Sequence, residues 1–115
     1  MLKRKFRISK KEQIANILKN GQVIKEDSFK IFFIKNNLQI TRFGILIKKN
    51  VYKKAVSRNR FKRVVSEILR LNINRFKTGY DVLVLLTNAL EPEELTFKML
   101  QPKILSLLKT SGILI

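Results

Sequence analysis

The pattern of apolar and polar residues divides the chain into alternating helical and extended segments. Near the start, apolar residues recur at helical spacing before Gly21, a good helix terminator: Ile14, Ile17 and Leu18. Ser9 followed by Glu12 is a capping-box pattern at the front of this stretch. A first helix is therefore expected over residues 10–20.

Extended segments follow this helix. A short strand is expected over residues 22–25 and a second, rich in Phe and Ile, over residues 29–35. A turn is expected at Asn36-Asn37, after which a third strand is expected over residues 41–48. Alternation in the third strand puts Phe43, Ile45 and Ile47 on one face and Arg42, Gly44, Leu46 and Lys48 on the other.

The period changes to that of a helix beyond Ser57. Its apolar stripe is Phe61, Val64, Val65, Ile68 and Leu69. Residues 80–87 are almost entirely apolar, as in a strand buried on both faces. A last helix is expected in the segment of Leu100, Ile104, Leu107 and Leu108, either bending at Pro102 or starting near it. This order of elements predicts an α/β sandwich.

Charge is the strongest functional signal in the sequence. The 115 residues include 25 Lys and Arg against 8 Asp and Glu, a net charge of +17. Residues 1–65 hold 19 basic and 3 acidic residues, whereas residues 66–115 hold 6 and 5. A domain with this much charge of one sign repels itself, and a phosphate backbone relieves that repulsion. Nucleic acid is therefore the expected partner, bound by the first 65 residues.

The composition also excludes several chemistries. The chain has no Cys and no His, which excludes disulfides, thiolate chemistry, the usual zinc sites and imidazole catalysis. Apolar runs such as residues 82–86 are far shorter than the roughly 20 residues that span a bilayer. The first residues also lack the apolar segment of a signal peptide. We expect one cytoplasmic domain over residues 1–115, with residues 1–8 as a basic, flexible arm and no membrane partner.

One segment concentrates the positive charge. Residues 48–63 contain 8 basic residues in 16 and no acidic one. Solvated helix faces usually mix signs, and Arg58 and Lys62 stand at the i, i+4 spacing at which like charges oppose the helix. Around the expected helix, Arg58 and Lys62 lie on one flank of the apolar stripe and Arg60 on the other, while Asn59, Arg63 and Arg70 point away from it. Such a helix suits phosphate, which the planar Arg side chain grips at two points.

A specific motif lies in this segment. It reads A-V-S-R-N-R-F-K-R over residues 55–63, after Phe43-Gly44 in the preceding strand and Lys48-Lys49-Asn50-Val51 beyond it. This arrangement resembles the R-N-R signature of the bacterial ribonuclease P protein family. The resemblance extends to the helix ending in Gly21, the strand entry at residues 79–82 and the total length, and so covers essentially the whole chain.

The resemblance implies a fold and a surface for RNA. The implied fold is α-β-β-β-α-β-α, a mixed four-stranded sheet with a left-handed βαβ crossover, ribosomal S5 domain 2-like. The residues implied to bind the catalytic RNA subunit are Lys48, Lys49, Lys53, Lys54, Arg58, Asn59, Arg60, Lys62 and Arg63. Those implied to bind the single-stranded 5′ leader of precursor tRNA, in a cleft between the first helix and the sheet, are Ile14, Leu18, Phe32, Arg42 and Lys62.

Residues at several of these positions leave alternatives open. Ile14 and Leu18 stand where the family commonly has aromatic residues, so aliphatic contact replaces base stacking, and periodic aliphatic residues are also normal core. Phe32 fits a leader site and a core position equally well, because either face of its strand can be interior. Ser66 stands where the family usually has Arg, which removes one phosphate contact.

The family resemblance assigns the chemistry to RNA. Precursor tRNA would be cut by the RNA subunit, which would hold Mg²⁺, while the protein binds tightly no cofactor of its own, has no catalytic residue and needs no protein partner. Two other classes of protein compete with this interpretation. A ribosomal or other structural RNA-binding protein of similar fold explains charge and length equally well, and only the R-N-R context and the leader cleft disfavour it. A protein-only nuclease is disfavoured because the chain has no His and no paired carboxylates.

Overall fold

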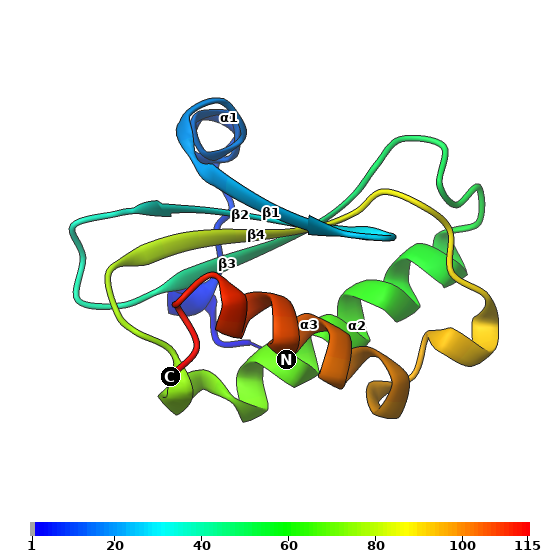
Figure 1. Cartoon of the computed structure of the whole chain (residues 1–115). Coiled ribbons are helices and arrows are strands. Elements are labelled where there is room, and N and C mark those ends of the chain that lie inside the picture. Colours follow the sequence, from blue (N-terminus) through cyan, green and yellow to red (C-terminus); the bar gives the residue numbers. More distant parts are fainter. Residues whose placement is uncertain (1) are drawn as a thin grey trace.

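The structure, a computed structural model, describes residues 2–115 and has helices on both faces of one sheet (Figure 1). The order of elements is the predicted one. The helices are α1 (Lys11–Asn20), α2 (Ala55–Leu71) and α3 (Phe97–Thr110), and the strands are β1 (Gln22–Glu26), β2 (Phe29–Lys35), β3 (Arg42–Ile47) and β4 (Tyr80–Leu86). Single 3-10 turns are η1 (Arg4–Phe6), η2 (Ile73–Arg75) and η3 (Pro92–Glu94).

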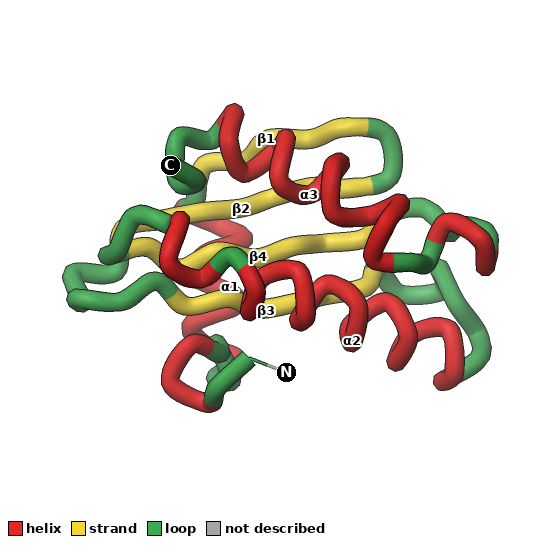
Figure 2. The backbone as a smooth tube through the Cα atoms, turned by 90° about the horizontal axis from the view of Figure 1, so that it is seen from below, coloured by secondary structure: helices red, strands yellow, loops and turns green. Residues whose placement is uncertain are grey.

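The sheet is mixed, with strand order β1-β2-β4-β3. β1 and β4 each pair antiparallel with β2, whereas β3 is parallel to β4. Figure 2 views the sheet from the side of α2: β3 and β4 both run left to right, and the chain passes upward from β3 to β4 through α2 in front. This crossover is left-handed, although about 98% of such connections are right-handed. The fold class is therefore confirmed.

Two hydrophobic clusters lie on opposite faces of the sheet. The larger one packs α2 and α3 against the residues of β2, β3 and β4 that alternate toward them, such as Ile31, Phe43 and Val84. The smaller one lies on the side of α1 and is built on Ile8, Ile17 and Leu83. Figure 1 shows α1 alone above the sheet and both longer helices below it.

Residues 2–8 differ from the flexible arm expected from their charge. The backbone N–H of Ile8 donates to the carbonyl of Phe43 at 2.9 Å, and Arg7 forms an isolated parallel bridge with Phe43 beside β3. Leu2 and Ile8 are buried in the larger and smaller clusters. Burying an aliphatic side chain gains about 1.5–3 kcal/mol, which opposes the entropy lost on ordering. At Gly44 a Cβ would lie 2.6 Å from Leu83 Cδ2, so a larger residue there would require the Leu83 side chain to shift, whereas its 3.6 Å distance from Ile8 Cβ is ordinary van der Waals contact.

The helix ends differ in detail from the sequence patterns. The capping box predicted at Ser9 is not formed: the N-cap of α1 is Lys10, without a side-chain hydrogen bond. The last helix does not start near Pro102. Thr96 caps α3, its hydroxyl accepting from the backbone N–H of Met99 at 3.2 Å, and α3 continues through an exposed Pro102. Within residues 2–115, no helix combines the length and apolar character that crossing a membrane requires.

Candidate nucleic-acid interface

The basic surface consists of the β3–α2 loop and the first two turns of α2. Its Lys and Arg side chains are exposed apart from that of Arg58, which is half-buried. Among residues 2–115, no carboxylate lies within ion-pair distance of any Lys or Arg of residues 48–63. A hollow of about 390 Å³ lies between the loop and the helix, and its cationic lining consists of Lys48, Lys49, Lys53 and Arg58. The surface therefore presents positive charge that no carboxylate of residues 2–115 neutralises by an ion pair.

Arg58 also fastens the loop that precedes α2. Its guanidinium Nη1 donates to the carbonyls of Tyr52 at 2.9 Å and Lys53 at 3.1 Å. Tyr52 is held in turn, because its hydroxyl donates to the carbonyl of Leu90 and accepts from the N–H of Leu90, both at 2.8 Å. Burial raises the pKa of the Tyr52 phenol above its ordinary value. These hydrogen bonds fix the loop against the β4–α3 connection.

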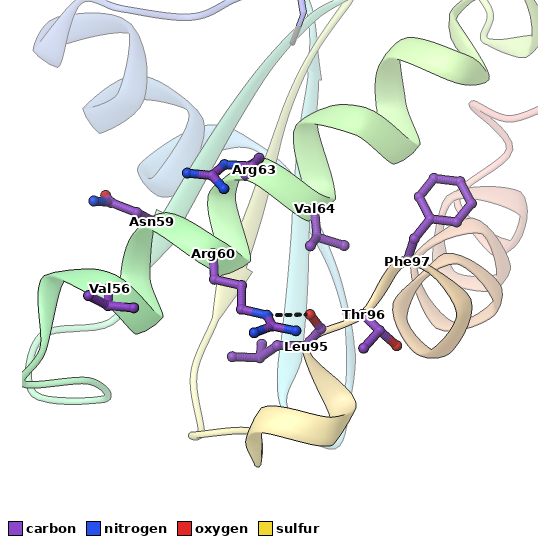
Figure 3. Close-up of a pocket in the computed structure, with 8 residues that line it drawn as sticks. All are labelled: Val56, Asn59, Arg60, Arg63, Val64, Leu95, Thr96 and Phe97. Atoms are coloured by element: carbon purple, nitrogen blue, oxygen red, sulfur yellow. Dashed lines mark hydrogen bonds between the residues drawn. The ribbon is translucent and has the colours of Figure 1, made fainter.

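The other motif residues lie around the exposed sides of α2. Arg60 Nε donates to the carbonyl of Leu95 at 3.1 Å, which ties α2 to the start of α3. Asn59 and Arg63 are exposed and project away from Leu95 (Figure 3). Ser66, where the family usually has Arg, is 6% exposed, so this position faces the packed interior and offers no phosphate contact. Positive charge without a paired carboxylate among the described residues therefore covers the outward sides of α2 in its first half, whereas Arg70 in the second half is paired with Glu67.

The second predicted surface lies on the other side of the sheet, and we call it the α1 face. Strand alternation and register bring three rows of side chains to it across β1, β2, β4 and β3. The rows are Lys25, Lys30, Leu85 and Leu46; Val23, Phe32, Leu83 and Gly44; and Ile34, Asp81 and Arg42. α1 packs over part of this face, with Ile17 only 1% exposed beneath it.

The structure brings some of the predicted leader-binding residues together and separates others. Phe32 and Ile14 are both half-buried and pack against the same small cluster, so Phe32 belongs to the α1 face and not to the larger core. Leu18 lies on an exposed flank of α1, 42% accessible. Lys62 lies on α2, which packs on the opposite face of the sheet, so the sheet separates Lys62 from Ile14 and Leu18.

Arg42 is engaged within the protein. Its guanidinium forms a two-point ion pair with the buried carboxylate of Asp81, at 2.9 Å from Nε and 2.7 Å from Nη2. Hydrogen bonding to this carboxylate raises the pKa of Arg42 above its ordinary value. The same carboxylate accepts from the side-chain amide of Asn36 at 2.9 Å. This network fixes Arg42 at the edge of the α1 face and neutralises its charge.

Two lysines on the α1 face were missed by reasoning from the sequence. Lys25 and Lys30 stand directly opposite each other in the β1–β2 ladder, and like charges in such a pair are destabilising. Among the described residues, neither has a carboxylate within ion-pair distance. The signal that finds them is alternation: once Phe29 and Ile31 are assigned to the larger core, Lys30 must share a face with Phe32.

The fold and these surfaces define a small α+β sandwich with a strongly basic helix face, a surface typical of proteins that bind polyanions. Comparison with known proteins makes this specific. The ribonuclease P family model matches residues 2–112. The ribonuclease P protein component of Thermotoga sp. (strain RQ2) is 34% identical over 108 residues, covering 92% of each chain. The chain therefore belongs to the ribonuclease P protein family, which decides against the ribosomal-protein alternative.

Solved structures agree with this assignment. The RNase P protein from Thermotoga maritima superposes with a TM-score of 0.76 at 29% identity, covering 90% of this chain and 96% of that one. The Staphylococcus aureus RNase P protein has the same fold, with a TM-score of 0.83 at 22% identity, covering 96% of this chain and 98% of that one. The chain is thus similar to the protein component of an endoribonuclease that processes tRNA.

Proposed function

We propose that the chain binds the ribonuclease P RNA subunit through the basic surface of residues 48–63 and the 5′ leader of precursor tRNA through the α1 face. In this way it assists removal of the leader, in the cytoplasm. The observation that carries the proposal is the set of eight cations in residues 48–63, the segment that bears the family's motif, none of which has a carboxylate within ion-pair distance among residues 2–115. Each cation that neutralises a phosphate releases a counterion, which favours binding at moderate salt.

The proposed roles of the basic residues follow their surroundings. Arg63, Asn59 and Lys62 are exposed and free to meet phosphates directly. Arg58 contributes charge to the hollow of the β3–α2 loop while it holds the loop in place. A loop that is fastened before binding loses less entropy on binding. The lysines of the loop, Lys48, Lys49, Lys53 and Lys54, supply further charge to the same RNA surface.

On the α1 face, the proposed leader site combines an aromatic ring with cations. Phe32 offers a ring face to an unstacked base, and stacking of this kind is worth about 1–3 kcal/mol per base. Ile14 and Leu18 add aliphatic contact beside it. Lys25 and Lys30 lie one row away, and a leader phosphate between them would relieve the repulsion of this like-charged pair. Arg42, in the row on the other side of Phe32, would orient the path of the RNA leader.

The proposed chemistry leaves metal ions to the RNA. Mg²⁺ prefers carboxylate and other oxygen ligands, whereas residues 48–63 contain only Lys and Arg as charged residues and therefore do not fit a Mg²⁺ site. In the rest of the chain, Asp81 and Glu94 are paired with Arg42 and Lys103. We derive no catalytic step from this chain's own residues. Its part is to reduce phosphate repulsion and to hold the leader.

Reconstitution tests the assignment of roles. The protein freed of RNA by nuclease treatment should leave precursor tRNA uncut, and cleavage should begin when the cognate RNA subunit and Mg²⁺ are added. Reproducible cleavage by the RNA-free protein would overturn the assignment of the chemistry to RNA.

The leader site has its own test in the ratio of precursor to mature tRNA affinity of the reconstituted enzyme. Phe32→Ala should lower this ratio, because the binding free energy of precursor relative to mature tRNA should lose the stacking energy of one base, about 1–3 kcal/mol. Phe32→Leu is the matched control for packing: it keeps apolar volume but lacks the ring face, so it should lower the ratio with little loss of thermal stability. An unchanged ratio in both variants, with stability lost in Phe32→Ala, would make Phe32 a core residue only.

A further inference from the structure

A second hollow lies between α2 and the start of α3, at the margin of the basic surface. Its volume is about 560 Å³, and we call it the α2–α3 pocket. It is lined by Val56, Asn59, Arg60, Arg63 and Val64 from α2, and by Leu95, Thr96 and Phe97 from the η3–α3 junction. Figure 3 shows Arg60 and Val64 projecting toward the junction, with Asn59 and Arg63 on the outer side of α2.

The floor of the α2–α3 pocket is apolar and incompletely covered. Val64 and Phe97 are half-buried at the margin of the larger core, and Val56 on the first turn of α2 is 76% exposed. One exposed and two partly exposed apolar side chains in one hollow indicate a surface that a partner covers. The open volume falls in the range of about 300–1,000 Å³ that is typical of ligand sites.

The rim of the pocket is cationic. Arg60 is held by its Nε bond to the Leu95 carbonyl, which fixes the plane of the guanidinium at the pocket. Within the described part of the chain, neither Arg60 nor Arg63 has a carboxylate within ion-pair distance. Asn59 adds an amide that can both donate and accept. The occupant must therefore combine a flat apolar surface with negative charge and hydrogen-bonding edges.

We propose that the α2–α3 pocket binds one unstacked nucleotide of the RNA subunit, a proposal that rests on the RNA binding proposed above. The base lies against Phe97 and the guanidinium of Arg60, and Asn59 and Arg63 meet its edge or its phosphate. Aromatic rings and Arg planes are the usual stacking partners of unpaired bases in RNA. The base must be unpaired, because bases inside an A-form helix do not present their faces to a pocket. Continuity with the basic surface of α2 favours RNA over an acidic peptide.

Site-directed crosslinking tests which nucleotide, if any, reaches the pocket. The chain has no cysteine, so Val56→Cys provides a single attachment point for an azidophenacyl group, at a side chain exposed enough to leave folding unchanged. In the enzyme reconstituted with the cognate RNA subunit, crosslinks should map to one or a few unpaired nucleotides. The control is Leu38→Cys, an exposed position in the β2–β3 loop, which should not label the same nucleotides. Crosslinks confined to paired nucleotides, to a protein or to nothing would overturn the proposal.

Binding of the RNA subunit supplies the second readout. Phe97→Leu keeps an apolar side chain in the pocket but removes the ring face, and should weaken binding roughly fivefold or more. Its salt dependence should match that of the unmodified protein, because every cation that meets a phosphate is still present. Phe6→Leu is the matched control, a half-buried Phe that does not line this pocket. If Phe97→Leu binds like Phe6→Leu, the pocket proposal is wrong, whereas failure of the unmodified protein to bind the RNA subunit would refute the proposed function itself.

Discussion

Arg58 combines two roles that a substitution can separate. Arg58→Ala removes a guanidinium that donates to two backbone carbonyls, those of Tyr52 and Lys53. Hydrogen bonds from charged groups contribute roughly 1.5–3 kcal/mol when buried. Since this site is only half-buried, water replaces part of the loss, and we expect the free energy of unfolding to fall by about 1.5 kcal/mol, the low end of that range. The position of Arg58 beside the apolar stripe predicts a surface residue whose removal changes stability by under about 0.5 kcal/mol, so the structure changes the expectation.

Arg63→Ala is the matched comparison. Arg63 is exposed in the same helix, and surface substitutions of this kind change stability by less than about 0.5 kcal/mol. Both variants should bind the RNA subunit more weakly, and removing one cation from a phosphate should reduce the salt slope by roughly 0.7–0.9. Arg58→Lys should restore most of the salt slope but little of the stability, because Nη1 alone donates to both carbonyls and the shorter Lys side chain ends one bond before the position of Nη1.

Urea unfolding followed by far-UV circular dichroism measures the stability difference, and filter binding at several salt concentrations measures how many phosphates each variant neutralises. If Arg58→Ala and Arg63→Ala have equal stability within about 0.5 kcal/mol, Arg58 does not fasten the loop and the reasoning from its hydrogen bonds is refuted.

Three further predictions concern the remaining charged and polar groups. Asp81→Asn should lower the free energy of unfolding by about 2 kcal/mol, less than for a fully buried pair because Arg42 is partly exposed, whereas Glu94→Gln should change it by under about 1 kcal/mol; equal effects in urea unfolding would contradict the Arg42–Asp81 network. In Tyr80→Phe, Tyr52 is the only phenol, and because burial raises its pKa, its absorbance should titrate above the ordinary value of about 10. The stability that the neutral Tyr52 contributes should be complete below that pH and should be lost as the pH rises through the folded-state pKa. Titration at or below the ordinary value would refute this. Sulfate should raise the melting temperature more than chloride of equal ionic strength, because clustered Lys and Arg bind it in the native state only; equal stabilisation would count against a preformed anion site.

The sequence predicts the regular elements well where a period persists. The stripe from Phe61 to Leu69 predicts α2, and the alternation of Phe43, Ile45 and Ile47 correctly assigns one face of β3 to the larger core. Composition predicts where the positive charge lies. The left-handed crossover could not be derived from periodicity, because a period contains no information on how a helix returns to the sheet; only the family motif carried it.

Sequence reasoning was least successful where tertiary contacts decide. Phe32 is ambiguous in the sequence because Phe29, Ile31 and Phe33 are equally apolar, and only the two clusters show which set faces α1. Arg42 resembles a free cation in the sequence, because its partner Asp81 lies far along the chain. Residues 2–8 resemble a charged tail because their basic residues outnumber the buried Leu2 and Ile8. In each case the deciding partner lies on another element.

The bridge between Arg7 and Phe43 of β3 has a consequence for handling the protein. β3 is an edge strand, and an open edge is a template for pairing with a second chain. The bridge of Arg7 to Phe43 and the Ile8 hydrogen bond cover part of that edge. Trimming these residues, or fusing a bulky domain directly before them, would expose backbone groups of β3 and favour association between sheets. A tag carried at the other end of the chain avoids this risk.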